Sequence, residues 1–408
     1  MKHVAIIGSA LSGNKGAAAM LESSIQTLNK EFGEKNIRYT LLSIYPHEDA
    51  QQNPYKNLAI VDAKPLTLGI VINTLSLLYR VLPPVRSLII RKSPAIAAIQ
   101  DADVLLDQGG ITFVDGREKF LLYNIASILP AILLKTPVVK CAQALGPFKN
   151  PINRFAAKLF LPRMAAIISR GAITQEYLDE LQLTNVTPGA DYAFLLELTS
   201  KEEKAARQKF DAKVLAGKQI VGVSPSVVMK KKVDGAGGDY ATEIVNFIDY
   251  LDGEGYGVML VPHSVRTGTN KTHNNDLMLC TEIYQRLQDR GACLFLDKEL
   301  PSQELRYFIG QCDYFVASRF HAMVSSLSMA VPTLVIGWSH KYREVLDMFE
   351  LSEWAFGQNK LSQSYLRKEF ARLVTQQAEI KQKLQTHLPE VKKLSEKQVQ
   401  VIADVVNG

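Results

Sequence analysis

The strongest constraint on the fold of this 408-residue chain is a pattern of strand-like and helix-like segments that alternate in two series along it. The first pair is the apolar run at residues 3–8 (HVAIIG) and the segment at residues 17–33, whose apolar residues recur at helical spacing. Continuous apolar runs of this kind are typical of parallel strands that are buried on both faces. The chain is therefore predicted to form parallel sheets that are covered by helices.

Similar apolar runs recur in both halves of the sequence. Those of the first half lie at residues 38–44, 102–108, 137–143 and 165–170, and those of the second half lie at residues 220–226, 256–264, 292–297, 313–318 and 332–337. A polar and charged segment at residues 197–219 separates the two series, and we interpret it as a linker with a surface helix. Two series of similar size predict an α/β protein with two Rossmann-like, doubly wound domains that face a cleft.

The predicted domains are residues 1–196 and 215–360, and a helical tail is predicted at residues 361–408. The tail is interpreted as helical because the sequence is polar and amphipathic from about Ser362 onward. Ligands of doubly wound sheets bind at the carboxyl ends of the strands, close to helix N-termini. We therefore expect the functional site in the cleft between the two domains.

The chain is mildly basic, with a net charge of +6 and a pI of about 8.9, and the excess positive charge is spread along the sequence. An anionic small substrate or an anionic membrane surface fits this charge as well as a nucleic acid does, and no feature demands a nucleic-acid partner.

The four cysteines form no Cys-x-x-Cys pair, and no histidine lies at zinc-ligand spacing from them. We interpret them as reduced, mostly buried thiols of a cytoplasmic protein, and we expect neither a metal nor a cofactor. The N-terminus is not interpreted as a signal peptide, because its apolar run is short and has no cleavage site.

The strongly apolar segment at residues 65–93 is interrupted by polar residues and by Pro83-Pro84. Its apolar part is shorter than the roughly 20 residues that a membrane-spanning helix needs. Two interpretations stay open. In the first, the segment is a helix that is buried against the sheet. In the second, it lies on the inner face of the plasma membrane, with Arg80, Arg86, Arg91 and Lys92 facing the lipid phosphates.

The apolar run at residues 313–318 leads directly into a predicted helix that begins with Arg319 and His321. Ser318 is the expected N-cap, which places both side chains in the first turn, where backbone N–H groups are unpaired and the helix dipole is positive. An arginine is electrostatically unfavourable there unless an anion neutralises it, and a protonated imidazole needs the same anion. The stretch therefore indicates a site for a strongly anionic ligand, with a surface arginine beside a packed histidine as the alternative.

Glycines and polar residues also follow other predicted strands. The N-terminal loop at residues 8–16 allows close backbone approach to a ligand, although it matches neither G-x-G-x-x-G nor a P-loop. Further candidates are Gly109, Gly110, Asp115, Arg170 and Asp191 in the first half and His263 in the second. Each alone is compatible with an ordinary turn, but polar groups at strand ends in both halves are what an inter-domain site requires.

Several of these stretches together resemble the polysaccharide pyruvyl transferase family. They are GNKGAAAML, DQGGITFVDG, QALGPF, SRGAIT, GADYAF and SRFHAMVSSLSMAVPTLVIGWSHKYREVL, which occur in the expected order and cover most of the chain. The most specific is Arg319-x-His321, followed by an apolar strand and Lys341. The resemblance implies a fold like that of GT-B glycosyltransferases. It also implies transfer of a pyruvyl group from phosphoenolpyruvate to sugar hydroxyls.

Roles carry over from the family to individual residues. Arg170 and Arg319 match arginines that hold the acidic groups of the donor, and His321 matches the candidate general acid. We expect the acceptor on the first domain and the donor on the second. Asn14 and Gly16 match the N-terminal loop of the family. Together with the strand-end candidates they complete the expected substrate-binding residues, which are Asn14, Gly16, Gly109, Gly110, Asp115, Asp191, His263 and Lys341.

The chain departs from the family at two places. The alanines at residues 17–19 follow the N-terminal loop where the family usually has an acidic residue, and Gln108 replaces the first of three glycines. The acceptor, which we expect to be a sugar or a lipid-linked oligosaccharide at the cytoplasmic membrane face, is therefore the less defined substrate.

Two other functions stay open at this point. A GT-B glycosyltransferase that uses a nucleotide-sugar fits the fold and the glycine-rich loops, although the Arg-x-His pair suits a compact trianion better than a nucleotide. The acidic residue that usually holds a donor ribose is not evident in the second half, where Glu344 is a candidate. A non-catalytic binding protein on the same scaffold is the third possibility, because the glycine-rich loops depart from the family.

Overall fold

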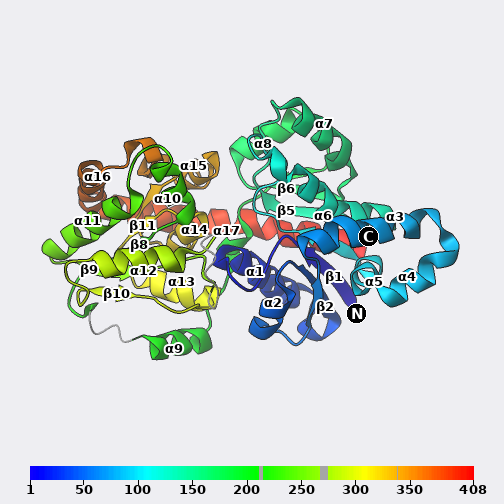
Figure 1. Ribbon diagram of the computed structural model, residues 1–408, viewed down its shortest axis with the longest axis horizontal. Coiled ribbons are helices and arrows are strands. Elements are labelled where there is room, and N and C mark those ends of the chain that lie inside the picture. Colours follow the sequence, from blue (N-terminus) through cyan, green and yellow to red (C-terminus); the bar gives the residue numbers. More distant parts are fainter. Residues whose placement is uncertain (211–214, 267–273, 338) are drawn as a thin grey trace. The chain divides into compact units, whose positions relative to one another are not determined.

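The computed structural model describes residues 1–210, 215–266, 274–337 and 339–408. The chain divides into two compact units, each built on its own sheet (Figure 1). Unit 1 comprises Met1–Ser12, Met20–Leu195 and Lys392–Gly408, and unit 2 comprises Gly13–Ala19 and Leu196–Val391.

Within the described residues, unit 1 contains a seven-stranded sheet in the order β3-β2-β1-β4-β5-β6-β7, and neighbouring strands are parallel. The strands are β1 (Lys2–Ile7), β2 (Ile37–Ser43), β3 (Leu58–Asp62), β4 (Val104–Asp107), β5 (Val138–Gln143), β6 (Ala166–Ser169) and β7 (Val186–Pro188). The central strands are fully buried, as their continuous apolar sequences predict. The edge strands β3 and β7 were not predicted, because they are short and partly exposed.

Helices connect the strands of unit 1 and cover its sheet. They are α1 (Lys15–Phe32), α2 (Pro46–Gln52), α3 (Asn73–Val81), α4 (Arg86–Lys92), α5 (Pro94–Asp101), α6 (Leu121–Leu134), α7 (Pro151–Phe160) and α8 (Ala172–Asp179). The core between sheet and helices includes Ile7, Leu105 and Ile128, all at most 1% exposed. Figure 1 shows α3 and α4 extending to one side of this sheet.

Unit 2 contains, in its described part, a six-stranded sheet in the order β10-β9-β8-β11-β12-β13. The strands are β8 (Ile220–Ser224), β9 (Gly257–Leu260), β10 (Cys293–Phe295), β11 (Tyr314–Ala317), β12 (Thr333–Ile336) and β13 (Ala355–Phe356). Neighbouring strands are again parallel, and Figure 1 shows β10, β9, β8 and β11 in this order. Two parallel sheets with connecting helices confirm the predicted α/β architecture with two domains.

The helices of unit 2 follow the same alternation. They are α9 (Ser200–Lys209), α10 (Val227–Asp234), α11 (Tyr240–Gly253), α12 (Asp276–Arg286), α13 (Ser302–Gly310), α14 (Phe320–Ser328), α15 (His340–Asp347), α16 (Gln363–Thr375) and the first part of α17 (Gln377–Asn407). Helix α9 is the surface helix that was predicted beside the linker. Residues 211–214 of that predicted linker lie outside the described residues.

The C-terminal tail is helical, as predicted, but it is not separate from the two units. Residues up to Val391 belong to unit 2, and the rest belong to unit 1. In unit 1, the Gln398 side chain accepts a hydrogen bond from Ala142 N (2.9 Å) and donates one to Ala190 O (2.7 Å). The amphipathic pattern predicts a helix but not the sheet on which it packs, and this assignment therefore required the structure.

The segment at residues 65–93 forms a short π-helical stretch, η2 (Thr67–Ile72), followed by α3 and α4. Leu68, Ile72 and Ile89 are buried in the core of unit 1, so one face packs as the first interpretation predicts. Among the described residues, no helix is long and apolar enough to span a membrane.

The four cysteines, Cys141, Cys280, Cys293 and Cys312, are buried and form no disulfide bond, which confirms their interpretation as buried free thiols. Burial raises the pKa of each thiol. They are therefore protonated near neutral pH and poorly nucleophilic.

Candidate active site

The end of the N-terminal loop lies in unit 2, although the sequence places it after the first strand of unit 1. Lys15 N donates a hydrogen bond to His263 O (3.2 Å), and Val265 N donates one to Gly13 O (3.0 Å). Asn14 forms an antiparallel bridge with Ser264. The loop is therefore held against the chain that follows β9, and it brings the predicted residues Asn14 and His263 together.

Lys15 has a structural role in this loop. Its side chain is 2% exposed, and Nζ lies 2.8 Å from Glu299 Oε1. The same carboxylate oxygen accepts a hydrogen bond from Gly13 N (3.1 Å). Asn14 Oδ1 accepts one from Gly16 N (3.1 Å), which fixes the start of α1. The lysine therefore stabilises the loop instead of matching a phosphate-binding P-loop.

Gly16 and His321, which are about 300 residues apart in the sequence, are in direct contact. A Cβ atom added at Gly16 would lie 2.0 Å from His321 Nδ1 and 2.3 Å from His321 Cγ. Only glycine therefore allows the imidazole to lie against the backbone of the first turn of α1. Because His321 also lies in the first turn of α14, the positive ends of two helix dipoles meet at this ring.

Arg319 is neutralised by an aspartate of its own chain. Its Nε and Nη2 atoms donate to the two carboxylate oxygens of Asp276 at 2.7 and 2.6 Å. Arg319, rather than the predicted Ser318, is the N-cap residue of α14. The electrostatic argument from sequence was thus incomplete, because the required anion is already present in the fold and a ligand is not needed to supply it.

Asp276, the first residue of α12, was missed by sequence reasoning. Its carboxylate also accepts hydrogen bonds from Val227 N (3.0 Å) and Ser264 N (2.9 Å). An acidic side chain in the first turn of a helix is a weak signal by itself, because many such residues only stabilise the helix dipole. Its partnership with Arg319 depends on packing between distant segments.

His263 is a buried neighbour of the same cluster. The pKa of its imidazole lies well below the usual value because of burial first, and then because of the positive charges of His321, Arg319 and Arg306. His263 is therefore neutral at physiological pH.

Lys341 also joins this cluster. Its Nζ atom lies 4.6 Å from the centroid of the Phe320 ring and 5.4 Å from that of Tyr342. The Phe320 ring packs edge-to-face against His321 (5.0 Å) and Tyr342 (5.6 Å). The structure therefore brings six of the predicted residues into unit 2. These are Asn14, Gly16, His263, Arg319, His321 and Lys341.

Arg170 and Asp191 form a buried pair in unit 1. Arg170 Nη1 lies 3.3 Å from Asp191 Oδ2, and their side chains are 1% and 0% exposed. Asp191 Oδ1 also accepts a hydrogen bond from Ala193 N (3.0 Å). The carboxylate that sequence reasoning assigned to substrate binding thus has partners within unit 1.

The glycine pair after β4 lies close to the first strand of unit 1. A Cβ atom at Gly8 would meet Gly109 N at 2.6 Å, and Gly109 N donates to Asp107 Oδ1 (3.0 Å). The buried Asp107 carboxylate forms an ion pair with Lys140. A Cβ atom at Gly110 would meet no atom within 4 Å, so the fold itself does not require glycine there.

Asp115 is a structural acceptor for the start of α7. Its carboxylate accepts hydrogen bonds from Lys149 N (2.7 Å), Asn150 N (2.9 Å) and Asn153 Nδ2 (2.8 Å). These bonds explain the residue without a ligand. Its predicted role in substrate binding stays a prediction, as does the location of the site between the domains.

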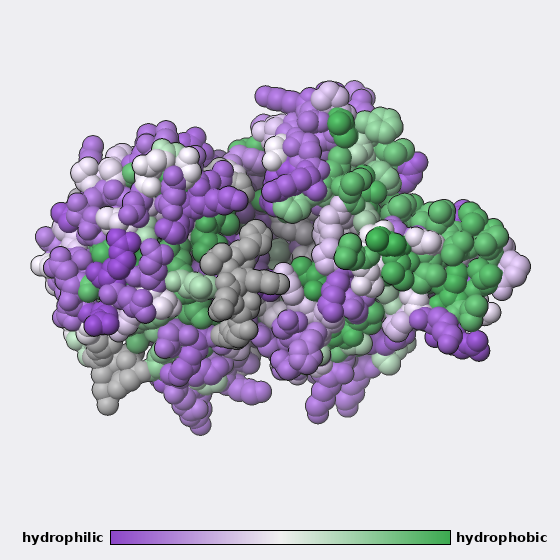
Figure 2. Space-filling view, viewed as in Figure 1, coloured by the Kyte–Doolittle hydropathy of each residue, from purple (hydrophilic) through white to green (hydrophobic). Residues whose placement is uncertain are grey.

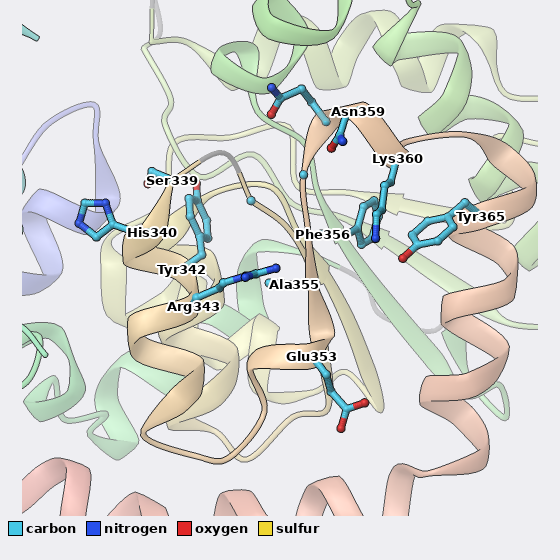
Figure 3. Close-up of a pocket in the computed structure, with 13 residues that line it drawn as sticks. Ser339, His340, Tyr342, Arg343, Glu353, Ala355, Phe356, Asn359, Lys360 and Tyr365 are labelled. Carbon is cyan, nitrogen blue, oxygen red and sulfur yellow. The ribbon is translucent and has the colours of Figure 1, made fainter. Parts of the chain in front are cut away.

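A cavity of about 640 Å³ lies at the carboxyl ends of β12 and β13 in unit 2. Figure 3 shows Tyr342 and Arg343 on one side of it and Phe356, Lys360 and Tyr365 on the other. Sequence reasoning missed this cavity, because the two-residue strand β13 gave no recognisable pattern. Among the described residues, no group of three or more His, Cys, Asp or Glu side chains is arranged to hold a metal ion.

Comparisons with known proteins agree with these features. Residues 14–340 match the model of the family described as polysaccharide pyruvyl transferase. The chain is 22% identical to the amylovoran biosynthesis protein AmsJ of Erwinia amylovora, over 86% of this chain and 87% of AmsJ.

Solved structures show a similar fold. The UDP-GlcNAc 2-epimerase of Neisseria meningitidis, solved with UDP-GlcNAc bound, has a TM-score of 0.63 at 10% identity and covers 99% of this chain and 100% of its own. Anabaena Alr3699/HepE, solved with UDP-glucose, has a TM-score of 0.57 at 13% identity, with coverages of 99% and 100%. These similarities confirm the GT-B-like fold class, and at such identities they show the fold alone.

Proposed function

Because the chain belongs to the polysaccharide pyruvyl transferase family, we propose that it moves the pyruvyl group of phosphoenolpyruvate onto sugar hydroxyls of an exopolysaccharide precursor. The product would be a pyruvate ketal. The observation that carries the proposal is the contact of His321 with Gly16, beside Arg319. This contact joins the two ends of the family match in one cluster.

Arg319 is suited to hold the donor even though it is paired. Asp276 uses Nε and Nη2 and fixes the plane of the guanidinium, and the side chain remains 17% exposed. The Nη1 edge makes no hydrogen bond with the described residues and is available for a carboxylate or a phosphate. Lys341 and the two helix N-termini at His321 add positive potential for an anionic donor. Arg170 stays the predicted donor ligand from unit 1.

The proposed reaction requires one acid and no metal. Protonated His321 donates its proton to the methylene carbon of phosphoenolpyruvate, and the neighbouring carbon becomes oxocarbenium-like. One sugar hydroxyl forms a C–O bond to that carbon, and the phosphate then leaves with the electrons of its own C–O bond. A second hydroxyl closes the ketal. Of the two hydroxyl protons released, one restores His321 and the other is taken up by inorganic phosphate.

The test is transfer of label. The protein is incubated with lipid-linked oligosaccharides of the source organism and phosphoenolpyruvate labelled at carbon, or in a parallel sample at phosphorus. We expect the carbon label in the glycan, in an acid-labile form, and the phosphorus label in inorganic phosphate. Transfer of the phosphorus label to the glycan would contradict the proposal, and so would transfer of sugar from a nucleotide-sugar in place of pyruvate.

A nucleotide-sugar transferase is the second candidate, and the cavity beside β13 favours it. Arg343 and Lys360 offer positive charge there, and Phe356 and Tyr365 offer aromatic surface. HepE was solved with UDP-glucose and the Neisseria epimerase with UDP-GlcNAc. We prefer the first candidate because the family match includes the Arg319-x-His321 motif, which lies outside the lining of this cavity.

A further inference from the structure

Exposed large apolar side chains are concentrated in unit 1. In η2, α3, α4 and their connections, the exposed ones are Leu66, Ile70, Val71, Leu77, Val81, Leu82 and Leu88. A second group, at the start of α6 and along α7, contains Phe120, Leu122, Ile152, Phe155 and Leu159. In the described part of unit 2, Met278 alone is in this class, at 41% exposed. We call the two groups in unit 1 the apolar face.

The two groups are connected through α6. Helix α3 packs along α6, and Asn73 Nδ2 donates to Ala126 O (3.1 Å). At the start of α6, the Glu118 carboxylate accepts from Asn150 Nδ2 (3.1 Å), which precedes α7. Figure 2 shows apolar residues gathered where Figure 1 places α3 and α4, with more near α7. An exposed apolar area of this extent indicates an interaction surface.

Two segments of the apolar face carry charges of one sign, whereas the start of α6 also holds the acidic residue Glu118. Residues 64–92 contain five Lys or Arg, and residues 149–163 contain four, with no Asp or Glu in either segment. These nine positive charges exceed the net charge of +6, so the rest of the chain is net negative. Arg80, Arg91, Lys92, Arg154 and Lys158 are exposed and form no ion pair with the described residues.

Helix α7 has the pattern of a helix that lies on a surface. Asn153, Ala156 and Ala157 are buried in unit 1, whereas Ile152 and Phe155 are 68% and 70% exposed. Apolar side chains of this size on the solvent side, with basic residues next to them, are typical of interfacial helices. Arg86 differs from the other arginines, because it donates to Tyr79 O (2.9 Å) and stacks on that ring.

We propose that the apolar face of unit 1 docks on the surface of an anionic lipid bilayer, with Ile152 and Phe155 on α7 and Leu77 and Val81 on α3 inserted among the lipids. An anionic bilayer matches both the exposed apolar side chains and the neighbouring basic residues, because it offers an apolar interior and a negative surface. Neighbouring basic residues would bind the phosphates. If the proposed function is correct, docking would hold the protein close to its lipid-linked acceptors.

The experiment is flotation of the full chain with vesicles in the absence of any substrate, so that it does not depend on the proposed reaction. Vesicles of phosphatidylcholine alone are compared with vesicles made of equal amounts of phosphatidylcholine and phosphatidylglycerol. We expect binding to the anionic vesicles and a loss of binding as salt is raised.

The variants separate apolar contact from charge. I152S/F155S and L77S/V81S are each expected to weaken partitioning about tenfold or more. R154Q/K158Q should weaken it by about fivefold for each charge removed. M278S in unit 2 is the matched control and should bind like the wild type. Circular dichroism melts check that each variant is folded, and all four apolar positions in unit 1 are at least 51% exposed.

Two outcomes would overturn the proposal. In the first, the wild type does not float with anionic vesicles, or both apolar double variants float as well as it does. In the second, gel filtration shows that the same variants convert a dimer to a monomer while vesicle binding is absent. The apolar face would then be an interface between two copies of the chain.

Discussion

Each unit has a Ser-Arg pair at the end of a buried parallel strand and before a helix, with Arg170 in unit 1 and Arg319 in unit 2. Each arginine is paired with an aspartate from a distant segment. The pairs differ in geometry, because Arg319 binds both oxygens of Asp276 at 2.6–2.7 Å, whereas Arg170 Nη1 lies 3.3 Å from Asp191. They also differ in exposure, at 17% for the Arg319 side chain and 1% for that of Arg170.

The same local sequence signal can therefore serve two purposes. A bidentate aspartate orients a guanidinium and still leaves one of its edges available to a ligand. In the fully buried pair of Arg170 and Asp191 the two charges compensate each other, and the role of Arg170 as a donor ligand stays a prediction. We therefore place the chemistry in the unit 2 cluster around His321.

Loss of the proposed general acid should reduce turnover more than any other substitution considered for this chain. His321→Asn should lower kcat for pyruvyl transfer by about 10²–10⁴-fold, because general acid catalysis contributes that much. His47→Asn, at an exposed histidine of α2 in unit 1, is the matched control and should leave kcat unchanged. Steady-state assays with labelled phosphoenolpyruvate measure both variants. Equal activity in the two would remove His321 from the mechanism.

The two ion pairs can be compared directly through stability. Asp276→Asn and Asp191→Asn should each lower the free energy of unfolding by about 3–5 kcal/mol, since each leaves an arginine without its counter-charge. The double variants D276N/R319M and D191N/R170M should recover part of that loss, because the uncompensated charge is removed and the asparagine keeps an acceptor for the backbone N–H groups. Urea denaturation followed by circular dichroism gives these values. Full stability in either single variant would show that its pair contributes nothing.

Glycine substitutions distinguish the two glycine-containing loops. Gly16→Ala should lower kcat by about 10²-fold, because the new methyl group would displace the His321 ring, which lies against this backbone. Gly110→Ala introduces a methyl group into open space and should leave stability unchanged. If Gly110→Ala abolishes activity and Gly16→Ala does not, a ligand approaches the backbone of unit 1 at Gly110. The assignment of the chemistry to the unit 2 cluster is then wrong.

The smallest effect concerns pH. The pKa of His263 is depressed in the folded state, so the unfolded state binds its proton first as the pH falls below about 6.5. The free energy of unfolding should then decrease by about 1.4 kcal/mol for each further pH unit because of this group, until the folded pKa is reached. His263→Gln should remove that part of the slope. If the free energy of unfolding depends on pH equally in the wild type and in His263→Gln, then His263 becomes charged in the folded protein.

The sequence predicted the strands that are long, apolar and central, because burial on both faces leaves a continuous pattern. It did not predict β3, β7 or β13, which are short or partly exposed edge strands. It also assigned the N-terminal loop to the first domain, whereas residues 13–19 pack in unit 2. A segment that packs in the other unit leaves no local signal of this in the sequence.

The candidate site shows the same limit. Arg319, His321 and Gly16 were found through motifs, and the structure brings them together. Asp276 was not found, since nothing in its local sequence distinguishes a helix-start aspartate from the partner of an arginine. The strand-end signal at Asp115 and Asp191 indicated polar groups correctly but could not show that hydrogen bonds within unit 1 engage both carboxylates.

The role of Arg319 in donor binding can be measured by calorimetric titration of phosphoenolpyruvate into the wild type, Arg319→Lys and Arg170→Lys, with UDP-glucose titrated in parallel. We predict that the wild type binds phosphoenolpyruvate and not UDP-glucose. Arg319→Lys should weaken that binding at least about tenfold, since lysine cannot pair with Asp276 and present a planar edge to the donor at once. Arg170→Lys should weaken it less in protein shown to be folded. Unchanged affinity in Arg319→Lys would show that Arg319 does not hold the donor, and binding of UDP-glucose alone would show that phosphoenolpyruvate is not the donor.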